Sequence, residues 1–215
     1  MGSLRRICVV WLALFCSGCA SVSGVANSNT HRDLPRSATF ATVLVDGDPV
    51  VGKKIERMLQ HQLAARGYEF TDKAPQLLVS FAFDVMPAGS VSRARTTVNH
   101  EPVQGRISSS GDRVTLDASR STATTYIDTT RLYRKTIAAR ITDLKTGAKL
   151  WDGVVSETGW CNQIFVTAPH ILSLMFYEFP REMTNVRRSV NNADSNTKEI
   201  KALFPSDTNW GCRKT

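Results

Sequence analysis

The sequence predicts an α+β domain, with a mostly antiparallel β-sheet and helices packed on one of its faces. Three observations predict this class: an amphipathic helix after an apolar strand, a strand in which apolar and polar residues alternate, and a β-hairpin followed by a second apolar helix. The chain has 215 residues, 42% of them hydrophobic and 21% charged. These proportions are typical of a globular protein and exclude wholesale disorder. No run of about 20 apolar residues is present, so we expect no transmembrane helix.

The first predicted strand covers Thr39–Asp46, where β-branched and aromatic residues dominate. A helix should follow, because Asp48 can cap its first turn and Pro49 suits the first helical position. Apolar residues then recur at helical spacing until Gly67, which can adopt the left-handed conformation that ends a helix. The alternating segment Gln76–Met86 predicts a strand with one face buried under this helix.

The middle of the chain, residues 88–130, is rich in Ser, Thr and Arg and poor in apolar residues. It is consistent either with a long excursion or with two or three polar strands that extend the sheet. A β-hairpin is predicted next, because Tyr133–Asp143 and Ala148–Glu157 both favour strands and are joined by a turn that contains Gly147.

A second helix is predicted over His170–Phe179, with Thr167 or Ala168 as its cap. Pro180 should end or kink it, after which the helical pattern resumes through Met183 and Val186. Residues 38–190 would thus form a single domain. Residues 191–215 would form a C-terminal tail, with a linker-like start.

The N-terminal residues 1–18 have the order of a secretory signal peptide: Arg5 and Arg6, then the apolar stretch Ile7–Cys16, then small residues. Ser17-Gly18-Cys19 resembles the end of a bacterial lipobox, which implies that Cys19 is lipidated and becomes the first residue of the mature protein. The third residue before Cys19 is Cys16, where the lipobox has leucine. Residues 19–37 are small and polar, and they predict a flexible tether between the lipid and the domain.

Three other interpretations of the N-terminus were weighed. A plain secretory peptide could be cut near Ala20 without lipid attachment, or the segment could be a buried helix of a cytosolic protein. N-myristoylation at Gly2 is excluded, because Arg6 stands where that motif needs Ser or Thr. Ala20 after the cysteine resembles lipoproteins that reach the outer membrane of Gram-negative cells. We therefore expect a lipid-anchored protein of the outer membrane with its domain facing the periplasm.

The five cysteines then have separate fates. Two leave with the signal peptide, Cys19 carries lipid, and Cys161 and Cys212 remain as a pair in an oxidising compartment, where a disulfide is the simplest chemistry. The competing interpretation is a reactive thiol at Cys161, assisted by His100 or His170.

Several motifs together resemble a family of Gram-negative lipoproteins known as domain of unknown function 4136. They are Leu63-Ala64-Ala65-Arg66-Gly67-Tyr68 at the end of the first helix, Pro75-Gln76-Leu77-Leu78-Val79-Ser80-Phe81 in the next strand, and the hairpin motif D-x-K-T-G-x-x-x-W from Asp143 to Trp151. The resemblance spans roughly Ala38 to Pro180. It implies an α+β layer and brings no catalytic residues.

No phosphate-binding loop, metal motif or nucleophile motif is present in the sequence, so we expect no enzyme activity, no cofactor and no metal. Between Ser90 and Lys135 there are eight basic and four acidic residues, so this segment has a net charge of +4, much of the positive excess of the mature chain. Five arginines there are candidate contacts for an anionic partner: Arg93, Arg95, Arg106, Arg113 and Arg120.

The expected function is non-catalytic binding of an envelope component. Candidate partners are an envelope protein, peptidoglycan or lipopolysaccharide, and nucleic acid is not expected in that compartment. Two alternatives stay open: a thiol-dependent or other envelope enzyme, and a structural protein that self-associates through sheet edges.

Overall fold

The computed structural model describes residues 21–109, 112–207, 210 and 212, and the side chains of all these except 100–109 and 112–121. The helices are α2 (Pro49–Ala64), α3 (Ile164–Met175) and α4 (Ser195–Ala202). The strands are β1 (Ser21–Thr30), β2 (Thr39–Asp46), β3 (Glu69–Phe70), β4 (Leu77–Ser109), β5 (Asp112–Asp143), β6 (Lys149–Gly159) and β7 (Met183–Asn191).

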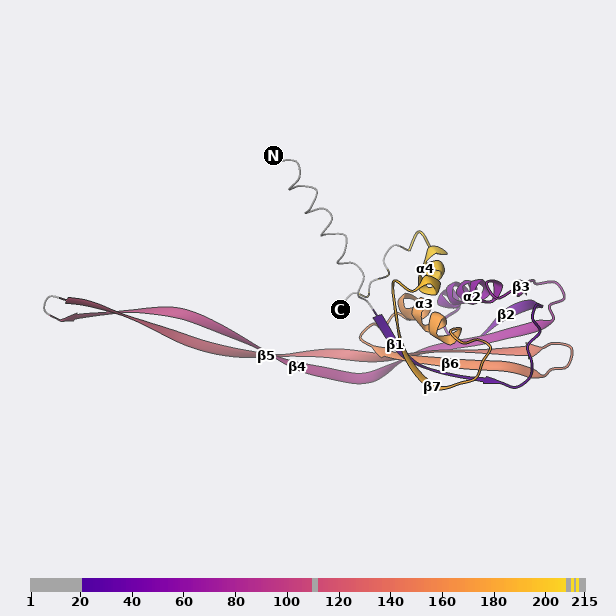
Figure 1. Cartoon of the computed structure of the whole chain (residues 1–215), viewed down its shortest axis with the longest axis horizontal. Helices are drawn as coiled ribbons and strands as arrows, with labels where there is room; N and C mark the ends of the chain where they lie inside the picture. Colours follow the sequence, from indigo (N-terminus) through magenta and orange to yellow (C-terminus); the bar gives the residue numbers. More distant parts are fainter. Residues whose placement is uncertain (1–20, 110–111, 208–209, 211, 213–215) are drawn as a thin grey trace, which may run out of the picture. The chain divides into compact units, whose positions relative to one another are not determined.

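The chain divides into two compact units, which we call the body and the ribbon. The body comprises the residues up to Ala88 together with those from Leu132 onward, and the ribbon is Gly89–Arg131. In the body, the strands form one sheet in the order β3-β2-β4-β5-β6-β1-β7. The helices α2, α3 and α4 lie on one side of this sheet (Figure 1). The α+β prediction is confirmed.

Most of the sheet is antiparallel, and its parallel part lies around β2. β2 pairs in parallel with β3 and β4, because α2 crosses over between them. β6 pairs antiparallel with β5 and with β1, and β7 pairs antiparallel with the other edge of β1. The predicted hairpin is therefore confirmed as β5 and β6, with Ile141 opposite Trp151.

The predicted first helix is confirmed as α2. The Asp48 carboxylate accepts hydrogen bonds from the backbone N–H groups of Val50 and Val51, both at 2.9 Å. Gly67 has a φ of +90° just after the helix, as the stop signal predicted. The apolar stripe of α2 packs on the inner face of the sheet, where these residues are at most 2% exposed: Phe40, Ile55, Met58, Leu59, Leu63, Leu77, Val79 and Phe81.

The prediction of a flexible tether is wrong for Ser21–Thr30, which forms β1 between β6 and β7. The reason is steric: a Cβ on Gly24 would lie 2.9 Å from Leu174 of α3 and 3.1 Å from the Ser156 carbonyl. Only small residues fit beneath α3, and Ala26 and Ser28 are accordingly 0% and 1% exposed. Small side chains suggested a linker in the sequence, but here they allow close packing of a helix on a sheet.

The second helix and the tail also differ from the predictions. α3 begins at Ile164, with Gln163 as its N-cap and without a side-chain capping hydrogen bond, and it contains Pro169. The predicted cap residues are buried inside the helix. The segment that should have resumed as a helix is instead β7, because its backbone pairs with β1. The predicted linker contains the start of α4, which Asp194 caps through Thr197.

The ribbon consists of the β4 and β5 segments between Gly89 and Arg131. Hydroxyl pairs hold their antiparallel register: the Oγ of Ser92 lies 3.0 Å from the Oγ1 of Thr129, and the Oγ1 of Thr96 lies 3.1 Å from that of Thr125. The middle segment therefore combines the two interpretations: it is polar strand, but it continues β4 and β5 as a separate unit and adds no further strand to the sheet.

Candidate functional site

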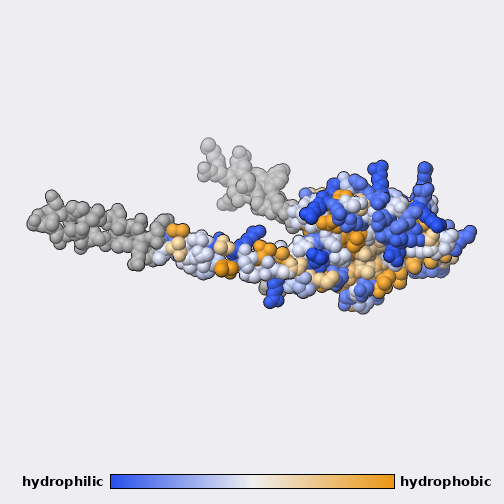
Figure 2. Space-filling view, turned by 90° about the horizontal axis from the view of Figure 1, so that it is seen from below, coloured by the Kyte–Doolittle hydropathy of each residue, from blue (hydrophilic) through white to orange (hydrophobic). Residues whose placement is uncertain are grey.

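The body has an open sheet face, opposite the helices. Strands alternate their side chains between the two faces, so each strand sends every second residue to this side. On β6, Trp151, Val155 and Glu157 are buried on the helix side, while Val154 and Thr158, each next to one of these residues in the sequence, are exposed. Figure 2 shows the molecule from below, and apolar and hydrophilic residues are mixed on the surface of the body there. No helix of the described residues covers this face, which makes it available to a partner.

An open hollow of about 610 Å³ lies on the open face over β1, β5, β6 and β7. Its size is within the range of ligand sites. Its lining is mainly hydroxyl, amide and guanidinium groups: Ser23, Gly24, Val25, Asn27, Arg134, Ser156, Thr158, Arg187, Arg188 and Ser189. We call it the arginine hollow.

The arginine hollow is electrostatically one-sided. Arg134 of β5 and Arg187 of β7 are both exposed and line it, and no carboxylate is among its lining residues. The acidic neighbour on β6, Glu157, points to the other face of the sheet. Guanidinium groups present fixed pairs of donors that match carboxylate and phosphate oxygens. The lining is therefore suited to an anionic group.

The register of β1 and β7 shapes one end of the hollow. The pairing of the two strands shifts between Ala26 and Ser28, because two residues of β7, Thr184 and Asn185, lie opposite the single residue Asn27, which is a β-bulge in β7. Asn185, with a φ of +52°, donates its backbone N–H to the Oδ1 of Asn27 at 2.8 Å. This hydrogen bond uses the amide oxygen of Asn27, and the amide N–H groups are the donors that Asn27 can offer to a ligand.

A third arginine at the hollow is held by an aromatic ring. The guanidinium of Arg188 lies 3.5 Å from the ring centroid of Tyr177, a cation–π contact. This contact limits the rotamers of Arg188, whereas Arg134 and Arg187 have no ion pair among the described residues. The two free guanidinium groups are the groups that an anion would engage first.

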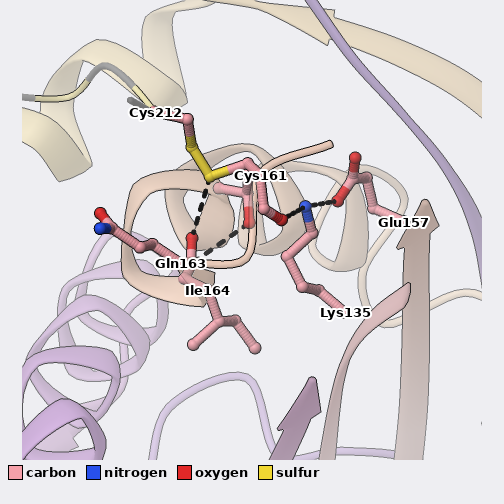
Figure 3. Close-up of a disulfide and its surroundings, with 7 residues drawn as sticks. Lys135, Glu157, Cys161, Gln163, Ile164 and Cys212 are labelled. Carbon is pink, nitrogen blue, oxygen red and sulfur yellow. Dashed lines mark hydrogen bonds and ion pairs between the residues drawn. A yellow bond between two sulfur atoms is a disulfide. The ribbon is translucent and has the colours of Figure 1, made fainter. Parts of the chain in front are cut away.

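A buried polar cluster supports the strands beneath the hollow (Figure 3). The Nζ of Lys135, which is 0% exposed, lies 2.6 Å from the Oε2 of Glu157 and donates to the carbonyl of Cys161 at 2.7 Å. Burial raises the pKa of Glu157, and the ion pair with Lys135 opposes this shift. Since Lys135 adjoins Arg134 along β5, the cluster fixes the backbone that presents the hollow.

The predicted disulfide is present between Cys161 and Cys212, with a Cα–Cα distance of 5.5 Å (Figure 3). It closes a sequence separation of 51 residues, which stabilises the fold by roughly 2–4 kcal/mol. The tail also docks through Trp210, whose ring stacks on Phe165 at 4.8 Å between centroids. With its sulfur in this bond, Cys161 has no free thiol for the alternative thiol mechanism.

The histidine that could have assisted a thiol has another role. His170 is 5% exposed on α3, and its Nε2 lies 2.9 Å from the Oδ1 of Asn192. Burial and the nearby charge of Lys201 lower the pKa of His170 to about 4, so the imidazole is neutral at pH 7. It therefore acts as a buried neutral donor toward Asn192. The side chain of His100 lies outside the described side chains.

The predicted site residues have different outcomes. Arg93 and Arg95 are exposed on the ribbon. Arg106, Arg113 and Arg120 lie in β4 and β5, but their side chains are outside the described set. Cys19, the predicted lipid attachment site, also lies outside the described residues.

The arginines of the hollow were not predicted as site residues. Arg134 belongs to the basic middle of the chain. On β5, Lys135 and Ile137 are buried on the helix side, and side chains of a strand alternate between its faces, so Arg134 lies on the open face. The position of Arg187 on the open face could not be predicted, because the sequence pattern predicts a helix in this segment. Within the described residues, no group of three or more His, Cys, Asp and Glu side chains could hold a metal ion, and no helix is long and apolar enough to span a membrane.

A family model described as domain of unknown function 4136 matches residues 25–181, which is most of the chain. The chain belongs to this family. The match includes β1 from Val25 onward, α2, the predicted hairpin and α3. Of the residues that line the hollow, it includes those of β5 and β6 and, on β1, Val25 and Asn27, but it begins after Ser23 and Gly24 and ends before Arg187.

Similar solved structures are distant from this member of the 4136 family. A PDZ domain protein from Parabacteroides distasonis has 13% identity and a TM-score of 0.48 over 87% of this chain. The chain spans only 42% of that protein's length. PelC from Paraburkholderia phytofirmans, a dodecamer in its crystals, has 12% identity and a TM-score of 0.39 over 71% of this chain and 94% of its own. No curated protein matches the sequence.

Proposed function

We propose that the chain is a non-catalytic, lipid-anchored protein of the outer membrane whose body binds an anionic envelope component in the arginine hollow. The proposed anchor is Cys19, and the proposed orientation is toward the periplasm. The single observation that carries the binding role is the lining of the hollow, which combines arginines and hydroxyl groups without a carboxylate.

The chemistry of the hollow supports an anion over a neutral ligand. Two exposed guanidinium groups can form paired hydrogen bonds to one carboxylate or phosphate. Hydroxyl groups of Ser156 and Thr158 lie on the strand between them and can donate to the remaining oxygens. Peptidoglycan carboxylates, lipopolysaccharide phosphates and acidic protein surfaces offer such groups in the proposed compartment, where nucleic acid is not an expected partner.

The hollow is a better candidate than the arginines predicted from the sequence. On the ribbon, Arg93 lies opposite Asp128 in the register that the hydroxyl pairs define, so part of the basic charge is compensated locally. The hollow has no such neighbour among its lining residues. The binding role is therefore assigned to Arg134 and Arg187 in the first place.

Binding to isolated peptidoglycan sacculi and to lipopolysaccharide vesicles would test the proposal. The full chain and the double variant Arg134→Gln with Arg187→Gln should be compared at constant ionic strength, because charged contacts weaken as salt rises. We expect the double variant to bind one of these surfaces at least roughly tenfold more weakly, since each charge-assisted bond contributes about 1.5–3 kcal/mol.

Arg140→Gln is the matched control. Arg140 is an exposed arginine of β5 that lies outside the arginine hollow, so the net charge changes without a change in the hollow. Equal losses in the control and in a single hollow variant, Arg134→Gln, would show that only general charge matters, and would contradict the assignment.

A further inference from the structure

β1 begins next to the proposed lipid attachment site. Its first residue, Ser21, is two peptide units from Cys19 in the sequence, and two units span at most about 7 Å in any conformation. Ser21 is already paired with Asn191 of β7. A flexible tether of about eighteen residues would reach roughly 25 Å, but the strand leaves almost none of that length free. With lipid on Cys19, the body therefore lies at the lipid surface.

Three strands form the end of the sheet at Ser21. Gly24 lies opposite Glu157 of β6, and the two strands are antiparallel. The end of β6 at Gly159 therefore lies beside the start of β1, and the end of β7 lies on the other side. We call this the β1 end of the body. The residues that form it are uncharged: Ser21, Val22, Gly159, Trp160, Asn191 and Asn192. The β1 end can therefore meet a headgroup layer without the desolvation of a charge.

An exposed indole lies at the β1 end. Trp160 directly follows β6 and is 42% exposed. Indole rings favour the membrane–water interface, because their apolar body enters the acyl boundary while their N–H group stays hydrated. The neighbouring Cys161 is bonded to Cys212, so the segment that carries Trp160 is cross-linked to the tail. Trp160 is thus suited to contact a bilayer surface.

The arginine hollow lies a short distance along the strands from the β1 end. Ser23 and Thr158 line it, and the four peptide units from Cys19 to Ser23 span at most about 14 Å. Arg134 lies opposite Thr158, and Arg187 pairs with β1 slightly further along. Phosphates of the leaflet that holds the anchor are therefore near the hollow. Attachment to that leaflet raises their effective concentration, to the order of millimolar for a short connection.

We propose that the β1 end rests on the phospholipid surface that holds the Cys19 lipid, with Trp160 in the interface and a headgroup phosphate in the arginine hollow. This inference rests on the lipid anchor and the anion binding proposed above, and it names the anion. Arg134 and Arg187 donate to the phosphate oxygens from two sides, as guanidinium groups commonly do. The phospholipid is favoured over an anion outside the membrane, because the anchor brings its phosphates to the hollow in every molecule.

Fluorescence quenching by brominated phospholipids tests the position of Trp160. The full chain, carrying its lipid, is reconstituted in vesicles of phosphatidylethanolamine and phosphatidylglycerol with bromine atoms near the headgroup end of the acyl chains. We expect the brominated lipid to quench the native chain, and Trp160→Phe to lose most of that quenching. The buried Trp151, which is 0% exposed, should stay unquenched in both proteins.

A lengthened chain is the control for the short connection. About ten Gly and Ser residues inserted between Ala20 and Ser21 let the body move roughly 15–20 Å from the lipid. Cys19, Trp160 and the hollow stay unchanged. Quenching should fall in this chain, because the anchor no longer enforces the contact with the headgroups. A purely structural role for Trp160 would not respond to the insertion.

The lengthened chain also tests the headgroup in the hollow. Here the two arginines help to hold the body at the surface, since each basic residue near an anionic membrane strengthens binding roughly fivefold. Adding Arg134→Gln and Arg187→Gln should reduce the ratio of docked to undocked body, which the remaining quenching measures, by roughly five- to thirtyfold. Arg140→Gln, outside the hollow, should leave this ratio nearly unchanged.

The outcomes separate this inference from the proposed function. Equal quenching of the native chain and Trp160→Phe, in chains that carry palmitate, would overturn the docking and leave the anchor intact. An equal effect of the hollow variants and Arg140→Gln would overturn the headgroup assignment, whereas binding to sacculi that depends on the hollow would still support the proposed function. A chain without palmitate would contradict the anchor and this inference together.

Discussion

His170 is a buried titratable residue whose neutral form the body stabilises. Its Nε2 is paired with Asn192, and Lys201 and Asp194 are the charged groups that influence it. The pKa of His170 is about 4 in the folded chain against 6.5 in an unfolded one. Because the folded pKa is the lower one, the unfolded chain takes up the proton first as pH falls. The contribution of His170 to stability is therefore fully present above pH 6.5 and is lost toward pH 4.

We predict that the free energy of unfolding falls by about 3 kcal/mol between pH 7 and pH 4 because of His170. Urea unfolding of the full chain and of His170→Gln at several pH values would measure it. The difference between the two profiles isolates His170, since Glu157 titrates in both proteins. Parallel profiles would show that His170 makes no such contribution.

At the residue scale, some residues with a structural role could be predicted from the sequence and others could not. The disulfide partners could be predicted, because elimination among five cysteines left one pair. The buried Lys135 could not, since a lysine in a strand reads as an exposed residue until Glu157 and the Cys161 carbonyl are known to face it. Long-range partners of this kind carry no local signal.

At the element scale, β1 is the strand that most changes the interpretation of the molecule. It supplies Ser23, Val25 and Asn27 to the arginine hollow on one side and packs beneath α3 on the other. If these residues formed a flexible tether instead of β1, the hollow would lack the lining that β1 supplies. The N-terminal segment therefore contributes to the candidate site as well as leading toward the proposed anchor.

We predict that Gly24→Ala destabilises the body by about 1–3 kcal/mol, because the added methyl group meets the Ser156 carbonyl and Leu174. Ser23→Ala is the control, since Ser23 is exposed on the opposite face of the same strand and should change stability by less than about 0.5 kcal/mol. Denaturant unfolding measures both. Equal stability of the two variants would contradict the packing of β1 under α3.

Elements with strong local signals were predictable, and those set by tertiary contacts were not. α2 has a capping aspartate, a proline and a terminal glycine, and the β5–β6 hairpin has a glycine turn between alternating strands. β1 and β7 have polar or small residues whose strand conformation depends on pairing with each other. Propensity alone does not determine such strands.

At the scale of the whole molecule, the proposal joins an anchored N-terminus to a body with a binding face. Cys19 is the residue on which the compartment depends, and its lipidation remains a prediction from the sequence.

We predict that the chain incorporates labelled palmitate when it is expressed in a Gram-negative host, and that Cys19→Ala abolishes the label. Cys16→Leu, which restores the usual lipobox residue, should retain or increase the label. A labelled Cys19→Ala variant, or an unlabelled native chain, would contradict the anchor.

The most direct test of the central claim is photo-cross-linking in intact envelopes with a probe inside the arginine hollow. A photoreactive residue in place of Thr158, which is exposed within the hollow, should capture a reproducible envelope component. The same probe in place of Leu144, exposed in the hairpin turn outside the hollow, should not capture it. Capture from both positions alike, or from neither, would contradict a binding role for the hollow.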